Sequence, residues 1–434
     1  MSVAGYRITL AQGGRWLFLV ALFLLPWQTR WIFGAEPVVG ELSEFGVLSF
    51  FVVEVFIVLA FLFQSLRQKD YQYQHVTIWG WLFLLTVLAT TLVASNRTLA
   101  IMQWMHVCVA YLLFLQLLER RIHPRTALTV FCLGLILPSL LGIYQAVAGA
   151  SPASTLLGLS AHDALVPGTS VIETFSYRWL RAYGSFQHPN VFGGYLAVGL
   201  IACLILPRFV RRRRAGVVWG ITAVLFLITL ILTYSRSAWV ALALSIFIAG
   251  WIVFTHHRAA LRRLVPLGLI LLIAGFFTAT LFINPLATRF DPTARLETKS
   301  IEERLDGFET WKGVMYDHGW RSWIGGVGVG NYVMAQADTY PDRDIYAYQP
   351  VHNVYLLLLG EIGVIGLILM VLWLGSIDRI NYRALPRLYA TGALAMGNTL
   401  LIIGFFDHYI WSLWPGLALL AFVMGMTLRL SGDD

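Results

Sequence analysis

Three arginines and one histidine stand in the polar segments that separate the long hydrophobic stretches of this chain. They are Arg181, Arg236, Arg304 and His352, with Asn190 and Asn353 as neutral hydrogen-bond donors nearby. A planar guanidinium binds phosphate oxygens bidentately, and a neutral imidazole accepts a proton near pH 7. If these side chains share one cavity, they predict transfer from a lipid-linked phosphate donor, with arginines rather than a metal stabilising the departing pyrophosphate.

Some of these residues can also be explained by a purely structural role. Arg236 lies in the short segment TYSRSAW (233–239), where an arginine can snorkel to the membrane surface or cap a helix. His352 follows Pro350 and can cap a helix or face lipid headgroups. Tyr355 shares the helix face of His352, whereas Glu361 lies about 180° around the helix and is interpreted as a packing or polar-network residue.

The elements that must position these residues are hydrophobic helices. The chain has 434 residues, 58% of them hydrophobic, and a mean hydropathy of +0.71. A transmembrane helix needs about 20 mainly apolar residues and must pair its own backbone groups. The sequence therefore predicts an all-α integral membrane protein, a single polytopic domain over 1–434 with about twelve transmembrane helices. These are centred near residues 24, 56, 86, 108, 137, 198, 225, 246, 274, 363, 397 and 420.

The basic residues predict how these helices are oriented. When the spans alternate, one set of connections holds most of the 31 basic residues and few of the 23 acidic ones. That side is cytoplasmic by the positive-inside rule, and it includes both termini. The cluster Arg211–Arg214 is then a topology signal, not a nucleic-acid site. Cys108, Cys132 and Cys203 fall in predicted spans, so no disulfide framework is expected.

A polar stretch, residues 285–350, lies between the ninth and tenth predicted spans and faces outward in this orientation. Ser300 and Glu303 fit a capping box that would start a helix. Apolar residues then recur at helical spacing, which predicts an amphipathic helix on the outer bilayer surface. They are Ile301, Leu305, Phe308, Trp311 and Met315. Arg304 shares this face and would meet an anion there, either a lipid headgroup or a substrate phosphate.

Two further patterns in this stretch resemble binding motifs but are interpreted as turns. Gly325–Gly330 looks like a phosphate-binding loop, but no strand precedes it and no lysine follows, which favours a flexible turn. Asp342 and Asp344 have a spacing that could hold a divalent metal, although a solvated turn is the favoured interpretation. We also find no pair of broken helices of the kind that marks many transporters.

Four segments together resemble the signature segments of the O-antigen ligase family, in the order in which the family has them. They are RAYGSFQHPN (181–190), TYSRSAW (233–239), ERLDGFETW (303–311) with GGVGVGNY (325–332), and VHNVYLLLLGEIGVIG (351–366). The resemblance covers about residues 170–380. It implies a type C-like membrane glycosyltransferase with a large periplasmic loop in the bacterial inner membrane. The donor would be an undecaprenyl-pyrophosphate-linked glycan and the acceptor lipid A–core oligosaccharide, without metal or other cofactor.

The resemblance also implies roles for individual residues. Arg236 and Arg304 would bind the pyrophosphate, and His352 would deprotonate the acceptor hydroxyl for an inverting displacement. Arg181 would contribute to donor binding. The remaining candidate substrate-binding residues are His188, Asn190, Trp311, Asn353 and Tyr355. An O-antigen polymerase or a protein O-oligosaccharyltransferase shares these features, and a lipid-linked oligosaccharide transporter is the alternative from another class.

Overall fold

The computed structural model describes residues 10–64, 73–119, 122–209 and 213–432 of the chain. Arg211 and Arg212 of the basic cluster lie outside the described residues. Helices dominate, as predicted. The hydrophobic ones are α1 Leu10–Leu24, α2 Val52–Gln64, α3 Gln74–Thr90, α4 Arg97–Leu118, α5 Pro124–Ala148, α6 Pro189–Ile205, α7 Arg213–Leu232, α8 Arg236–His256, α9 Arg258–Leu281, α14 Val354–Ala384, α15 Leu388–Gly404 and α17 Trp414–Gly432.

Within the described residues, six helices are long and apolar enough to cross a membrane: α4, α5, α8, the Leu264–Leu281 part of α9, α14 and α17. The other six in the series are apolar but shorter, so a total of twelve spans stays a prediction. The centre predicted near residue 24 is wrong for the first helix, because α1 already ends at Leu24. Pro26 follows, and a helix usually ends before a proline.

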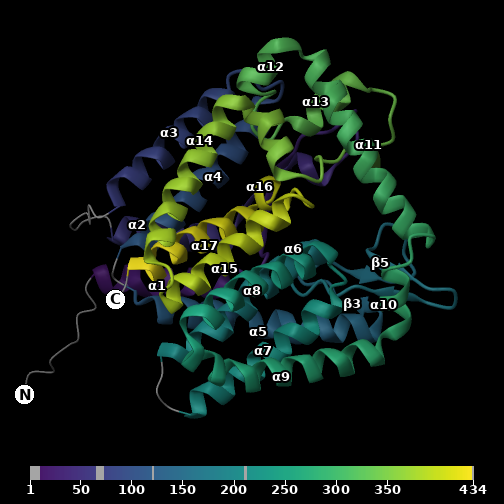
Figure 1. Ribbon diagram of the computed structural model, residues 1–434. Helices are drawn as coiled ribbons and strands as arrows, with labels where there is room; N and C mark the ends of the chain where they lie inside the picture. Colours follow the sequence, from purple (N-terminus) through teal and green to yellow (C-terminus); the bar gives the residue numbers. More distant parts are fainter. Residues whose placement is uncertain (1–9, 65–72, 120–121, 210–212, 433–434) are drawn as a thin grey trace, which may run out of the picture.

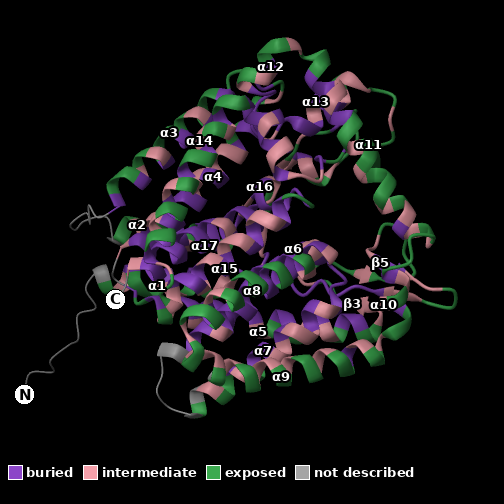
Figure 2. Ribbon diagram, viewed as in Figure 1, coloured by how far each residue is buried: buried purple, intermediate pink, exposed green. Residues whose placement is uncertain are grey.

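Two groups of helices lie on either side of a central pair (Figure 1). Helices α5 to α9 form one group, and α3, α4 and α14 lie in the other. Helices α15 and α17 run between them and contact both. Figure 2 shows buried residues along α6 and α17, whereas α9 is largely exposed. A helix that is hydrophobic all round suits a protein core, and an exposed apolar helix such as α9 suits contact with lipid.

Three small antiparallel hairpins connect the helices. Strand β1 (Arg30–Ala35) pairs with β2 (Val47–Phe51), and a short 3-10 helix, η1 (Glu44–Gly46), precedes β2. Strands β3 (Ala150–Ser151) and β4 (His162–Asp163) pair in the segment before α6, as do β5 (Val171–Glu173) and β6 (Arg178–Leu180). Residue Arg181 follows β6 directly, so the last hairpin leads the chain into the first motif.

The polar stretch between α9 and α14 folds into short helices and one longer helix. They are α10 Ile283–Arg289, α11 Arg295–Asp317, α12 Gly319–Gly325, α13 Tyr332–Thr339 and the 3-10 turn η4 Ile345–Ala347. In Figure 1, α11 runs along the edge of the molecule from the neighbourhood of α10 and β5 to α12 and α13. Helix α11 therefore connects the two helix groups.

The predicted start and surface of α11 are both partly wrong. The helix begins at Arg295, not after Ser300, because Glu297 in its first turn is buried and held by ion pairs. Ile301 and Leu305 are exposed, as a surface helix requires, but Trp311 and Met315 are buried. The indole Nε1 of Trp311 donates a hydrogen bond of 2.8 Å to the Leu356 carbonyl. The second half of α11 therefore packs against protein instead of lipid.

Helix α14 is broken near its start, which the sequence did not predict. Gly363 has φ 66°, in the left-handed region, inside the helix. The glycine-rich loop fills the break: the Val327 N–H donates to the Gly360 carbonyl at 2.8 Å, and the Gly328 N–H donates to the Glu361 carbonyl at 3.0 Å. The loop is a turn, as predicted, but these backbone bonds tie it to α14.

Candidate active site

His352 lies just before α14, opposite the loop that joins α15 to the short helix α16 (Tyr409–Ser412). Asn353 caps α14, since its Oδ1 accepts 3.0 Å hydrogen bonds from the backbone N–H groups of Tyr355 and Leu356. The Asn353 Nδ2 donates to the Phe405 carbonyl at 3.2 Å. One asparagine thus fixes both the start of α14 and its distance from the facing loop.

The buried carboxylate of Asp407 faces the His352 ring. Oδ1 of Asp407 lies 3.9 Å from Nδ1 of His352, and the two side chains are 5% and 24% exposed. This separation is too long for a direct hydrogen bond, and the buried Nδ1 has no hydrogen-bond partner among the described residues. Since Asp407 faces Nδ1, Nε2 at the other edge of the ring is the nitrogen that can take a proton from a substrate.

A second histidine flanks the pair. The rings of His352 and His408 lie 5.1 Å apart, and the His408 backbone N–H donates to Asp407 Oδ1 at 2.9 Å. Burial lowers the pKa of His408 to about 4. Burial raises the pKa of Asp407, but the surrounding histidines more than offset this and hold it below its usual value. At neutral pH the site therefore contains an ionised Asp407 beside a neutral His408.

A chain of hydrogen bonds connects Asp407 to the first motif. The Asn190 Nδ2 donates to Asp407 Oδ2 at 2.7 Å, and an Arg181 terminal nitrogen donates to Asn190 Oδ1 at 2.6 Å. The Arg181 Nε donates to the Thr233 carbonyl at 2.7 Å. Segments from three distant parts of the sequence therefore meet at this site.

His188 contacts Asn190, a member of this hydrogen-bond chain. It is the N-cap of α6, which begins at Pro189, a residue type suited to the first turn of a helix. Its Nδ1 accepts a 3.1 Å hydrogen bond from the Asn190 N–H, and its Nε2 lies 3.2 Å from the Ser170 hydroxyl. Burial, followed by the charge of Arg181, lowers the pKa of His188 to about 3. His188 is thus a neutral cap that orients Asn190.

A second group of arginines surrounds the buried carboxylate of Glu297 on α11. Its Oε2 lies 3.0 Å from an Arg236 terminal nitrogen and 2.6 Å from one of Arg289. The Arg289 Nε donates to the Tyr234 carbonyl at 2.9 Å. Tyr234 has φ 49° in the turn between α7 and α8, a strained conformation that its surroundings must hold in place. The ion pairs fix Arg236 relative to α11.

Arg304 brings a further positive charge to this group. It lies close enough to Arg236 for the two charges to repel each other. Arg304 Nε and one Arg236 terminal nitrogen are buried without a hydrogen-bond partner among the described residues. An unsatisfied buried donor is costly, and an anion bound between the two guanidiniums would remove that cost.

Charge counting supports an anion site. The four arginines that act on one another here are Arg181, Arg236, Arg289 and Arg304, and the two carboxylates are Glu297 and Asp407. The arginines outnumber the carboxylates by two, which leaves a positive field at the boundary of the helices. A doubly charged phosphate ester fits this excess.

The remaining candidates make structural contacts. The Tyr355 hydroxyl donates to the Leu401 carbonyl at 2.8 Å, and its ring lies 4.5 Å from that of Phe405. Trp311 joins α11 to α14, as described above. These contacts do not test substrate binding by Asn353, Tyr355 or Trp311, which stays a prediction.

Among the described residues, His352, Asp407 and His408 are the group whose geometry could hold a metal ion, with ligand atoms within 4.8 Å of one another. One His408 nitrogen, Nδ1, is already 2.6 Å from the Ser412 hydroxyl. Asp342 and Asp344 are exposed, and Asp344 accepts a hydrogen bond from the Tyr346 hydroxyl at 2.7 Å. This is the solvated turn that the sequence favoured.

Sequence reasoning missed Asp407, His408, Arg289 and Glu297. Asp407 and His408 are ionisable neighbours between the last two hydrophobic segments, and such a position is a reason to suspect function. Arg289 and Glu297 carry no comparable signal, because their proximity to Arg236 depends on how α10 and α11 fold back.

One family model matches part of the chain. Residues 221–371 match the family model described as O-antigen ligase. The matched range contains Arg236, Arg289, Glu297, Arg304 and His352, and leaves Arg181 and Asp407 outside. No curated protein matches the chain.

Proposed function

We propose that this chain, whose resemblance to the O-antigen ligase family is confirmed over residues 221–371, is a glycosyltransferase of the bacterial inner membrane. It transfers a glycan from undecaprenyl pyrophosphate to a sugar of lipid A–core oligosaccharide at the periplasmic face. The observation that carries the proposal is the hydrogen-bond chain from Arg181 through Asn190 to Asp407, beside His352. It supports a single site with both a base and cations for the leaving group.

In the proposed reaction, Nε2 of His352 removes the proton from an acceptor hydroxyl. The oxygen attacks the anomeric carbon of the donor glycan from the face opposite the pyrophosphate, so the configuration inverts. The bond between that carbon and the pyrophosphate oxygen breaks, and its electron pair leaves with the lipid pyrophosphate. Asp407 stabilises the imidazolium that forms at His352.

The three arginines have different roles in the proposed reaction. Arg236 and Arg304 each have a buried donor without a hydrogen-bond partner in the part of the chain that the structure describes, and in the proposal these donors bind the pyrophosphate as its charge develops. Arg181 already donates to Thr233 and Asn190. Its main role in the proposal is to position the Asn190–Asp407 pair and to add positive charge.

The test uses purified protein, lipid-linked glycan and lipid A–core, with a chelator in place of added metal. We expect the conjugate from the wild type and at least about a 10²-fold lower rate from His352→Ala, since a general base contributes about 10² to 10⁴. Donor binding and thermal stability should remain near wild type. His75→Ala, on an exposed position of α3, is the matched control.

Other products would identify other functions. Longer lipid-linked glycan without lipid A–core indicates a polymerase, and glycan on a protein acceptor indicates a protein O-oligosaccharyltransferase. Movement of the lipid-linked glycan across a bilayer without any conjugate indicates a transporter. Full activity in His352→Ala would contradict its role as the base, whatever the product.

A further inference from the structure

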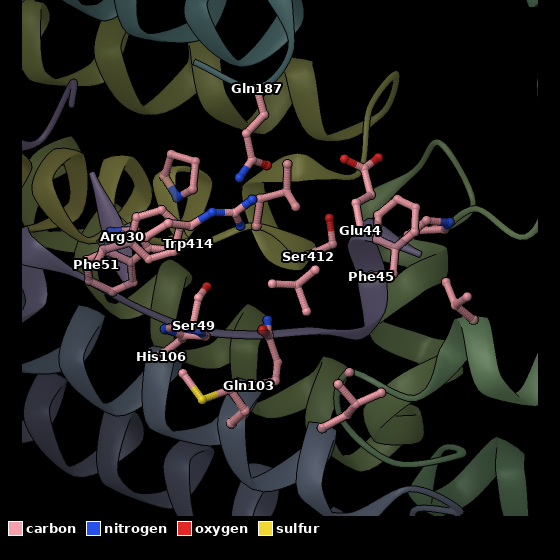
Figure 3. A pocket seen from close by; sticks show the side chains of 18 of the residues that line it. Arg30, Glu44, Phe45, Ser49, Phe51, Gln103, His106, Gln187, Ser412 and Trp414 are labelled. Carbon is pink, nitrogen blue, oxygen red and sulfur yellow. The ribbon is translucent and has the colours of Figure 1, made fainter. Parts of the chain in front are cut away.

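An open pocket lies near His352 and His408, and the arginines of the candidate active site are not among its lining residues. The β1–β2 hairpin, helix α4 and the start of α17 form its walls (Figure 3). In Figure 3 the polar ends of Arg30, Gln103 and Gln187 extend into the space from different sides. None of Arg181, Arg236 and Arg304 lines this pocket.

The pocket adjoins His352 through its neighbours. Ser412 lines the pocket, and its hydroxyl lies 2.6 Å from Nδ1 of His408. Phe45, another lining residue, has its ring 5.9 Å from that of His408, which in turn lies 5.1 Å from His352. Pro350, two residues before His352, completes this end. A molecule in the pocket would therefore lie next to Ser412 and Phe45, on the side of His408 and its neighbour His352.

The lining has unused hydrogen-bonding capacity. The side chains of Arg30, Glu44, Ser49 and Gln187 make no hydrogen bond with any of the residues that the structure describes. The Gln103 amide donates from Nε2 to the Trp411 carbonyl at 2.9 Å, and its oxygen makes no such bond. Polar groups that converge on a concave space without partners indicate a polar ligand.

The charges and the aromatic rings of the lining residues indicate which class of ligand the pocket suits. Arg30 is opposed by the carboxylate of Glu44 in the lining, so the pocket has no excess of positive charge for a phosphate. Phe45, Phe51 and Trp414 add aromatic rings. A sugar ring has hydroxyls that pair with guanidinium, carboxylate and amide groups, and an apolar face that packs on aromatic rings.

We propose that this pocket binds the sugar of the acceptor whose hydroxyl His352 deprotonates. The inference rests on the proposed function and adds the acceptor's location to it. The donor sugar must stay next to the pyrophosphate, which the proposal assigns to arginines outside the pocket. The pocket lies next to His408 and so on the His352 side of the site, and the sugar that needs the base is the acceptor.

Two variants that are not expected to disturb folding test this assignment. Gln187→Ala removes a side chain that makes no hydrogen bond, and Arg30→Gln keeps most of the length while removing the charge. Gln74→Ala and Arg321→Gln are matched controls at exposed positions outside the pocket. Initial rates are measured against acceptor concentration at saturating donor, and against donor concentration at saturating acceptor.

We expect both pocket variants to raise the KM for the acceptor about tenfold, as the loss of one or two hydrogen bonds to substrate does, with the donor KM within about twofold of wild type. A rise in the donor KM alone would assign the pocket to a donor sugar and overturn the inference. Unchanged values for both substrates would also overturn it. If Arg30→Gln fails to fold, Gln187→Ala decides the question.

A binding measurement separates this inference from the proposed function. Lipid-free core oligosaccharide is added to His352→Ala protein, and contact with the sugar protons is followed by saturation-transfer NMR. Binding that disappears in the His352→Ala, Gln187→Ala double variant supports the pocket even if the wild type transfers nothing to lipid A–core. Equal signals in the single and double variants contradict the pocket, while transfer by the wild type leaves the function intact.

Discussion

At the scale of single residues, the site depends on buried charges that are not fully neutralised by protein partners. Asp407 is ionised and almost fully buried beside a half-buried His352, and Arg236 and Arg304 each have a buried donor that bonds to none of the described residues. Such arrangements cost folding free energy unless a ligand or a reaction uses them. They give two residue-level predictions.

Asp407→Asn should lower kcat about 10²-fold with little change in either KM, because it removes the charge that stabilises a protonated His352. The pKa of Asp407 lies below its usual value, so the wild-type carboxylate is charged at every pH above 5. The wild type and the variant are compared by initial rates at pH 7, with each substrate varied at a saturating concentration of the other.

The two KM values distinguish this role from a purely structural one. Asp407 also accepts hydrogen bonds from Asn190 and His408, so a loss of activity alone could come from misplacement of the loop. A rise in both KM values together with the lower kcat would show that Asp407 only holds the loop in place.

Arg304→Ala should raise the donor KM or Kd about 10- to 100-fold, the loss expected for a charge-assisted hydrogen bond. Arg304→Lys should recover little of this, since an ammonium cannot bind phosphate oxygens bidentately. Equilibrium binding of the lipid-linked donor measures both variants. Arg321→Ala, on the exposed side of α12, is the control, and donor affinity equal to wild type in Arg304→Ala would contradict the assignment.

At the scale of elements, the break in α14 determines where His352 stands. The glycine-rich loop inserts at the break and pairs with the carbonyls of Gly360 and Glu361. A Cβ at Gly363 would lie 2.1 Å from the Ile324 carbonyl oxygen. The first two turns of α14, which follow His352, are thus held by a loop that belongs to the polar stretch.

Gly363→Ala should destabilise the protein by about 2–4 kcal/mol, because it combines a left-handed conformation with a backbone clash. Thermal unfolding in detergent, followed by tryptophan fluorescence, measures the loss. Gly375→Ala in the same helix is the control, since a Cβ there meets no atom within 4 Å; it should be neutral or slightly stabilising. Equal midpoints for the two variants would contradict the role of the break.

At the scale of the whole molecule, the charge bias predicts that the polar stretch lies on the outer side of the membrane. Cysteines introduced by Lys299→Cys in α11 and by Tyr382→Cys near the end of α14 occupy exposed positions. In a background without the three native cysteines, an impermeant maleimide should label Lys299→Cys in intact spheroplasts. Tyr382→Cys should react only after the membrane is opened. The reverse pattern would invert the predicted topology.

Some features of the protein are determined by local sequence. The positions of most hydrophobic helices follow from the composition of each window, the start of α6 follows from Pro189, and the sharp turn before Arg236 follows from the few polar residues there. The importance of Arg236, Arg304 and His352 was also predicted, because each is a polar or ionisable residue in a segment that resembles a family signature.

Other features were decided only by the tertiary structure. The partner of His352 is Asp407 from the opposite loop, Arg181 is tied to Thr233 and Asn190, and Glu297 is shared by two arginines. The sequence determined which segments are hydrophobic and where they turn, because transfer and capping energies are local. It could not determine how charges pair, because burial of a charge is stabilised by whichever partner the packing of distant helices brings to it.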